Sequence, residues 1–180
     1  MTIRELTTEE IKDIYYKYMT DDFPPDELKP FDRIEESVSA GKYLCLGAFE
    51  NTQLVAYAFW VFENKTYLLD YYAVVPELRG KGVGTAFLKE AVKLIPAEII
   101  LLEVEDPTDE EKKKRLDFYL NAGCVDPNVK AVAFGVDFMI IEYPIKGNHS
   151  PSVIADAYKE IYRSILPQKM YEDNISIVNE

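Results

Sequence analysis

Three of the chain's eight glycines lie within five residues, where an apolar run typical of a strand meets a helical pattern. They are Gly80, Gly82 and Gly84. Glycine adopts backbone angles that other residues avoid and leaves neighbouring amides accessible, and the N-terminus of a helix attracts anions. The junction therefore predicts either an anion-binding loop or a tight turn that needs glycine for its backbone alone. Arg79 and Lys81 add positive charge within the loop, which favours the anion site.

The spacing of the loop excludes two common phosphate-binding motifs. A P-loop needs four residues between its first glycine and a Gly-Lys-Ser/Thr sequence, which this chain lacks. A dinucleotide fingerprint needs glycine where Thr85 stands, and also a second strand-helix-strand half for which the chain has no room. We therefore expect a different phosphate-containing ligand.

Hydrophobic periodicity around the junction predicts alternating groups of helices and strands. Two short helices come first, and three consecutive antiparallel strands lead into the glycine loop. A helix, a strand, a second helix, a hairpin and a last helix follow. The expected helices span 8–20, 31–39, 83–95, 108–120 and 151–166, and the expected strands span 43–49, 54–62, 67–75, 98–105, 129–134 and 138–143.

Two of these boundaries carry specific signals. Thr108 and Glu111 have the spacing of a capping box at the start of a helix. Gly123 follows the same helix and suits a left-handed cap at its end.

Length and charge restrict the class of protein and its partners. A chain of 180 residues indicates one domain, which buries roughly 70% of its unfolded surface. A net charge of −12 repels nucleic acid and anionic lipid, so we expect neither as a partner. The first residues contain no apolar signal segment, and no apolar run is long enough to cross a membrane. We therefore expect a cytoplasmic protein.

The reactive side chains exclude further classes of site. Cys45 and Cys124 fit no metal-binding pattern, and we expect reduced, buried thiols. The single histidine, His149, lies in a loop and is a poor candidate for a catalytic triad or a zinc site. We expect no metal cofactor.

The sequence Arg79-Gly80-Lys81-Gly82-Val83-Gly84 resembles the acetyl-CoA signature of the GNAT superfamily of N-acetyltransferases, Arg/Gln-x-x-Gly-x-Gly/Ala. Its context is similar as well. The preceding strand ends Ala73-Val74-Val75-Pro76, and the second helix after the loop ends Phe118-Tyr119-Leu120-Asn121-Ala122-Gly123, which looks like the family's Leu-Tyr-x-x-x-Gly-Phe.

The resemblance covers about residues 2–144 and implies a fold. It is the single-domain α/β (α+β) fold of acyl-CoA N-acyltransferases, with a mixed, mostly antiparallel central sheet flanked by helices. We expect this domain over residues 1–146. Residues 147–180 form an expected C-terminal helical extension, whose apolar face packs either on the domain or across the interface of a homodimer.

The resemblance also implies where acetyl-CoA binds. The amides of residues 80–85 hold its pyrophosphate, and the strand before the loop pairs its backbone with the pantetheine arm. The implied cofactor-binding residues are Tyr72, Ala73, Val74, Arg79, Gly80, Lys81, Gly82, Val83, Gly84 and Thr85.

Acyl transfer to an amine needs a neutral amine, a polarised carbonyl and a proton for the departing thiolate. By resemblance Tyr119 is the general acid; the alternative is a tyrosine that packs on the core. Asp70, Glu103 and Glu105 are the candidate bases, and each is alternatively a solvated charge on a strand. Asp70 is a candidate because some relatives have an acid at its position that binds or deprotonates the amine.

The chain departs from the family pattern at two positions. Lys112 stands where the family often has an asparagine that binds CoA, so a basic residue takes over the nucleotide contact or belongs to a solvated helix face. Cys124 replaces the usual phenylalanine after Gly123, which we interpret as a packing change.

The function implied is that of an N-acetyltransferase (EC 2.3.1), with acetyl-CoA as the donor and a primary amine of a small molecule or peptide as the acceptor. Neither cysteine is placed as an acyl carrier, which favours direct transfer. The alternative is a protein of the same fold that binds CoA in a regulatory role without catalysis. The sequence contains no motif that identifies the amine.

Overall fold

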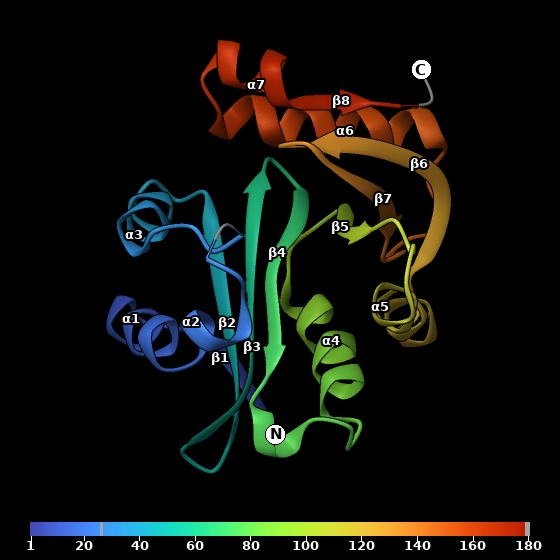
Figure 1. Cartoon of the computed structure of the whole chain (residues 1–180). Helices are drawn as coiled ribbons and strands as arrows, with labels where there is room; N and C mark the ends of the chain where they lie inside the picture. The colour runs from blue at the N-terminus through green and yellow to red at the C-terminus, as the bar shows by residue number, and fades with distance from the viewer. Residues whose placement is uncertain (26, 179–180) are drawn as a thin grey trace. The chain divides into compact units, whose positions relative to one another are not determined.

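The computed structural model describes residues 1–25 and 27–178, which form two compact units. The first unit comprises residues 1–61 and 71–91, and the second comprises residues 62–70 and the chain from residue 92 onward. The strand order is β1-β2-β3-β4 in the first and β4-β5-β7-β6-β8 in the second, so β4 passes through both (Figure 1). The expected mixed, mostly antiparallel sheet with flanking helices is confirmed.

The strands of the first unit are paired from the N-terminus onward. β1 is antiparallel to β2, and β2 is antiparallel to β3, with an irregularity at Ala48 and Phe49. β4 is the next neighbour of β3, and just after β4 the N–H of Val75 donates to the Val55 oxygen at 3.0 Å. The strands are β1 Thr2–Glu5, β2 Tyr43–Glu50, β3 Gln53–Glu63 and β4 Thr66–Val74.

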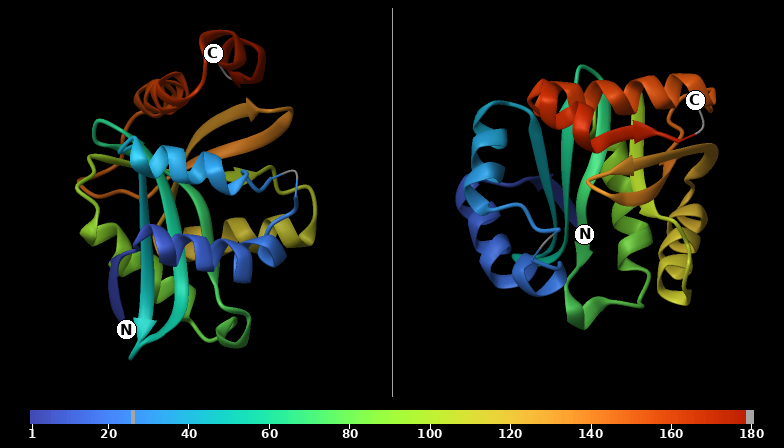
Figure 2. Two further views of the ribbon diagram at one scale, coloured as in Figure 1. Left: turned by 90° about the vertical axis from the view of Figure 1, so that its left-hand side faces the viewer. Right: turned by 45° about the horizontal axis from the view of Figure 1, so that its top comes forward.

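Helices cover both faces of these strands. In Figure 2, α1 and α3 run side by side over the strands, and α3 contacts β2. The helix expected over 8–20 is continuous as far as Asp22, with a π-helical turn in its middle. The helical segments are α1 Thr8–Ile14, η1 Tyr15–Met19, α2 Thr20–Asp22, α3 Phe31–Ser39, η2 Pro76–Leu78 and α4 Val83–Leu94.

Two consecutive tyrosines near the end of β4 pack on opposite faces of the strand. Successive strand residues point to opposite faces. The ring of Tyr71 meets Phe23 and Phe59 edge to face, with centroids 4.9 and 6.4 Å apart. The ring of Tyr72 stacks on Phe87 of α4 at 5.5 Å. The end of β4 therefore packs against Phe23 and Phe59 through Tyr71 and against α4 through Tyr72.

In the second unit, residues Thr66–Leu69 of β4 pair in parallel with Ile99–Leu102 of β5. The remaining pairs are antiparallel, and β8 forms the end of the order beside β6. The strands are β5 Ile99–Glu105, β6 Val125–Ala133, β7 Val136–Glu142 and β8 Ile175–Ile177. The helices are α5 Glu110–Ala122, α6 Pro151–Ile165 and α7 Gln168–Asn174.

The start of α5 corrects one prediction. Asp109, not Thr108, caps the helix, because its carboxylate accepts the backbone N–H groups of Glu111 and Lys112, both at 2.9 Å. Thr108 lies in a tight turn, in which its own N–H donates to the Asp106 oxygen at 2.7 Å. At the other end, Gly123 has φ 115° and forms the expected left-handed cap.

The C-terminal segment contains more than the expected helix. α6 contacts β5, β6 and β8, and its buried face includes Ile154, Tyr158 and Ile161. β8 follows α7 and pairs with β6, and the sequence prediction missed this strand. None of the helices in the described part of the chain is both long and apolar enough to cross a membrane.

Candidate functional site

The glycine loop connects β4 to α4 in the first unit. Gly80 and Gly82 have φ values of +73° and +80°, which residues with a Cβ rarely adopt. A Cβ placed on either glycine would meet no heavy atom within 4 Å. The backbone angle therefore requires glycine here, while the space beside the loop is open.

The two cations of the loop brace its backbone. The Arg79 Nε donates to the Val74 oxygen at 2.9 Å, and its guanidinium also bonds the nearly buried carboxylate of Asp22. The Lys81 Nζ donates to the Glu77 oxygen at 2.8 Å. The sequence pattern predicts that these charges contact an anion. In the structure their side chains contact protein oxygens. The backbone N–H groups of the loop are therefore the main groups that could bind an anion.

The backbone N–H groups concerned lie in the first turn of α4. Its first N–H groups, from Val83 to Thr85, have no acceptor within the helix, and the ladder begins with Ala86 donating to Gly82 at 3.1 Å. The Tyr72 hydroxyl donates to the Gly84 oxygen at 2.5 Å and ties this turn to β4. Tyr72, predicted as a backbone contact for the cofactor, thus also fixes the loop through its side chain.

In the second unit, Glu103 on β5 meets two hydroxyl groups. Tyr158 and Tyr162 of α6 both donate to its Oε1, at 2.5 and 2.7 Å. Burial, reinforced by the charge of Glu103, raises the pKa of both tyrosines, so both hydroxyls keep their protons. The helical periodicity of the sequence places these tyrosines on an apolar face and does not predict their contact with Glu103.

The other two candidate carboxylates differ in their surroundings. Glu105 forms ion pairs with Lys112 at 2.7 Å and with Arg115 at 3.4 Å. Lys112, considered as a nucleotide contact, is therefore engaged with this acid. Asp70 is half-buried at the point where the pairing of β4 with β5 ends, and its negative charge contributes to the raised pKa of Tyr162.

Tyr119 lies near the end of α5 and is half-buried. Its ring meets Phe118 edge to face at 5.0 Å. Burial raises the pKa of its hydroxyl, and the positive charge of Arg115 opposes this rise. The hydroxyl is therefore protonated at neutral pH, as a proton donor must be.

Neither cysteine has the surroundings of a reactive nucleophile. Cys45 and Cys124 are both buried. Burial raises the pKa of Cys45 strongly and raises that of Cys124 to about 12. The thiolate is the reactive form of cysteine, and neither residue supplies it at neutral pH.

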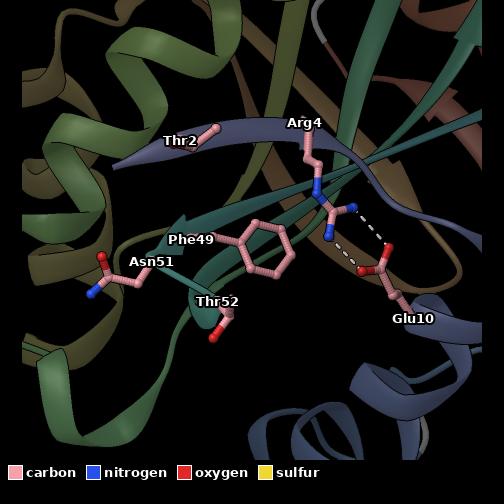
Figure 3. Close-up of a pocket in the computed structure, with 6 residues that line it drawn as sticks. All are labelled: Thr2, Arg4, Glu10, Phe49, Asn51 and Thr52. Atoms are coloured by element: carbon pink, nitrogen blue, oxygen red, sulfur yellow. Dashed lines mark hydrogen bonds and ion pairs between the residues drawn. The ribbon is translucent and has the colours of Figure 1, made fainter.

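A surface hollow of about 460 Å³ lies elsewhere in the first unit (Figure 3). The Arg4 guanidinium is bonded twice to the Glu10 carboxylate there, at 2.8 and 2.5 Å, and lies 4.3 Å from the centre of the Phe49 ring. These charges are paired with one another, and the hollow contains none of the candidate residues. Among the described residues, no cluster of three or more potential metal ligands is present.

Comparisons with known proteins identify one family and one fold. The model of the Acetyltransferase (GNAT) family matches residues 8–119. No curated protein matches the sequence.

Solved structures share the fold. A Bacteroides thetaiotaomicron protein described as a GNAT-family acetyltransferase is 20% identical, with a TM-score of 0.72 over 92% of this chain and 96% of that one. Spermidine N-acetyltransferase of Vibrio cholerae is 16% identical, with a TM-score of 0.60 over 80% and 95%. The PaiA N-acetyltransferase of Thermoplasma acidophilum, in complex with coenzyme A, is 21% identical, with a TM-score of 0.54 over 80% and 98%. At these identities the likeness concerns the fold.

Proposed function

Because the chain belongs to the GNAT acetyltransferase family, we propose that it transfers an acetyl group from acetyl-CoA directly to a primary amine of a small molecule or peptide. Members of this family are N-acyltransferases. The observation that carries the proposal is the loop between β4 and α4, where two glycines with positive φ leave the backbone beside a helix N-terminus open.

The residues of the loop fit the cofactor. The amides of Gly80, Lys81, Gly82, Val83, Gly84 and Thr85 would hold the pyrophosphate, and the backbone of Tyr72, Ala73 and Val74 would pair with the pantetheine arm. Arg79 contributes by bracing the loop through Val74 and Asp22. Acetyl-CoA, when bound, supplies an activated acyl group as a thioester.

Transfer also requires a proton for the departing thiolate and a group that accepts the proton of the amine. We assign Tyr119 as the group that gives a proton to the departing thiolate, because its hydroxyl is protonated and it occupies the family's tyrosine position. Asp70 and Glu103 are the candidates for receiving the proton of the amine. Glu105 is a weaker candidate, since two cations already pair with it.

The state of the thiols supports direct transfer. An acetyl-enzyme intermediate would need a reactive nucleophile, and the buried Cys45 and Cys124 both have raised pKa values. An acetylated cysteine trapped after mixing with acetyl-CoA would contradict this order.

The charge distribution supports an amine acceptor. The net charge of −12 favours a cationic partner over nucleic acid or anionic membrane. Eight of the twenty basic residues fall in 77–93 and 112–115, while the other 159 residues carry 12 basic and 30 acidic side chains. We also propose that the protein is cytoplasmic and works without a metal cofactor.

Calorimetric titration with acetyl-CoA tests the proposal at its first step. We expect saturable binding of acetyl-CoA and of free coenzyme A, and we expect no binding of NAD. Absence of heat with both coenzyme A forms would refute the function. Binding without any transfer to amines would leave a non-catalytic CoA-binding protein, the alternative from the same fold.

A further inference from the structure

A carboxylate outside the glycine loop binds the first cation of that loop. Asp22 is the last residue of α2, and its Oδ1 accepts a hydrogen bond from the guanidinium of Arg79, 57 residues away in the sequence. Both residues belong to the first unit. The side chain of Asp22 is 7% exposed, whereas that of Arg79 is 51% exposed. The acid is therefore the enclosed member of the pair, and the arginine reaches it from the surface.

Other residues of the first unit hold Asp22 in place. The hydroxyl of Tyr57, a residue of β3 with no exposed surface, donates to the Asp22 Oδ2 at 2.8 Å. Burial, reinforced by this hydrogen bond, raises the pKa of Tyr57, so the hydroxyl keeps its proton and remains a donor. The next residue, Phe23, packs its ring on Tyr71 of β4 at 4.9 Å. Both carboxylate oxygens of Asp22 thus have a partner, and its neighbour is packed on the sheet.

Arg79 connects this carboxylate to the strand before the loop. Its Nε donates to the oxygen of Val74, the last residue of β4, at 2.9 Å. A guanidinium carries its N–H groups in one plane, so two acceptors fix its orientation. Gly80, with φ +73°, follows Arg79 directly. The entry to the glycine loop is therefore tied to β4 and to the end of α2 at the same time.

The charges of the pair argue against a direct role of Arg79 in attracting phosphate. A carboxylate beside the arginine offsets its positive charge and repels an anionic ligand. A nearly buried acid at this place therefore opposes anion binding by its charge alone. Its contribution to the loop is geometric, because it holds the side chain from which the loop begins.

We propose that Asp22 is a positioning residue for acetyl-CoA, which acts through Arg79 to hold the glycine loop in its binding conformation, and that Tyr57 supports Asp22. The inference rests on the proposed function and deepens it, because it names residues outside the loop that control its affinity for the cofactor. The segment that resembles the acetyl-CoA signature, residues 79–84, contains neither Asp22 nor Tyr57.

The direction of one change in affinity separates position from charge. Asp22→Asn removes a negative charge near an anion-binding loop, so electrostatics alone would strengthen the binding of acetyl-CoA. We expect the opposite, a loss of at least about threefold in calorimetric titration of the full chain. Glu10→Gln is the matched control, because it removes the same charge and breaks the Arg4–Glu10 pair elsewhere in the first unit. It should bind acetyl-CoA like the unmodified protein.

A double-mutant cycle tests whether Asp22 acts through Arg79. Arg79→Gln should also weaken binding, and Asp22→Asn should cause no further loss in that background, since the contact is already absent. A general packing defect would weaken both backgrounds equally. Tyr57→Phe removes one hydroxyl and should weaken binding about twofold, again only while Asp22 is present. If Asp22→Asn fails to fold, Tyr57→Phe with and without Arg79→Gln carries the test.

A measurement without ligand keeps the inference separate from the proposed function. ¹⁵N relaxation of the Gly80 and Gly82 amides reports the order of the loop. The order parameters should fall toward about 0.6, the value of a flexible backbone, in Asp22→Asn and Arg79→Gln. They should not change in Glu10→Gln, and the amide of Gly135, in the turn between β6 and β7, should not change in any variant.

Two results would overturn the inference. One is acetyl-CoA affinity in Asp22→Asn that equals or exceeds that of the unmodified protein, and the other is unchanged order in the loop of both variants. If the unmodified protein binds no acetyl-CoA, the proposed function fails, while the relaxation data still decide whether Asp22 orders the loop.

Discussion

Placing a negative charge in the glycine loop tests its role as the pyrophosphate site. Gly82→Glu imposes two costs, the strain of a side chain at φ +80° and repulsion of an anionic ligand. Gly135, in the turn between β6 and β7, has φ +81° and equally open surroundings. Gly135→Glu therefore carries the same strain and the same charge outside the loop, and the difference between the two variants isolates the effect at the site.

The expected size follows from electrostatics. Two like unit charges about 4 Å apart repel by about 1 kcal/mol in bulk water and by about 4 kcal/mol near a protein surface. We therefore expect Gly82→Glu to lower acetyl-CoA affinity by at least about tenfold, with a smaller loss at high salt because ions screen the charge. Gly135→Glu should bind as the unmodified protein does.

Isothermal titration calorimetry at two salt concentrations is the assay, with thermal unfolding as the control for strain. If Gly82→Glu binds acetyl-CoA normally, the loop is only a tight turn. Equal losses in the two variants would show that strain or global charge, rather than the site, causes the effect.

Three further experiments test the proton donor, the cap of α5 and the pKa of Glu10. Tyr119→Phe should lower kcat about 10²-fold without changing acetyl-CoA affinity, and an unchanged kcat would remove it from the mechanism. Asp109→Ala should lower the urea midpoint of unfolding, while Thr108→Ala should leave it nearly unchanged; the reverse order would contradict the observed cap. The hydrogen bond from Arg4, aided by the Thr7 backbone, lowers the pKa of Glu10 to about 2. The ionised Glu10 carboxylate contributes its full stability above pH 4.5, the pKa of the unfolded state, and this contribution is lost as the pH falls toward 2. The urea midpoint of Glu10→Gln should therefore fall less steeply with decreasing pH than that of the unmodified protein.

The loop could be predicted because its physics is local. Glycine at positions 80 and 82 supplies positive φ, and the flanking strand and helix have clear hydrophobic periods. The bounds of β2, β3 and β4 agree with prediction to within one residue for the same reason. The short strands β1 and β8 were missed, because they depend on backbone pairing with β2 and β6 and not on a pattern of their own.

Contacts between distant residues could not be predicted. Tyr158 and Tyr162 are 55 and 59 residues away from Glu103 in the sequence, yet their hydroxyls bind it. Hydrophobic periodicity predicts only that these tyrosines belong to an apolar helix face. The partner of Arg79, Asp22, lies 57 residues away. Glu103 and Glu105 alternate on one strand and could be distinguished only when the structure showed hydroxyl groups beside the first and cations beside the second.

Amine-dependent release of coenzyme A is the measurement that tests the central claim most directly. Purified protein is mixed with acetyl-CoA and a library of primary amines, and free thiol is followed over time. We predict that at least one amine accelerates thiol release and is recovered as its N-acetyl derivative, with no acetylated protein cysteine on the way. Tight acetyl-CoA binding with no acceleration by any amine would contradict the assignment as a working N-acetyltransferase.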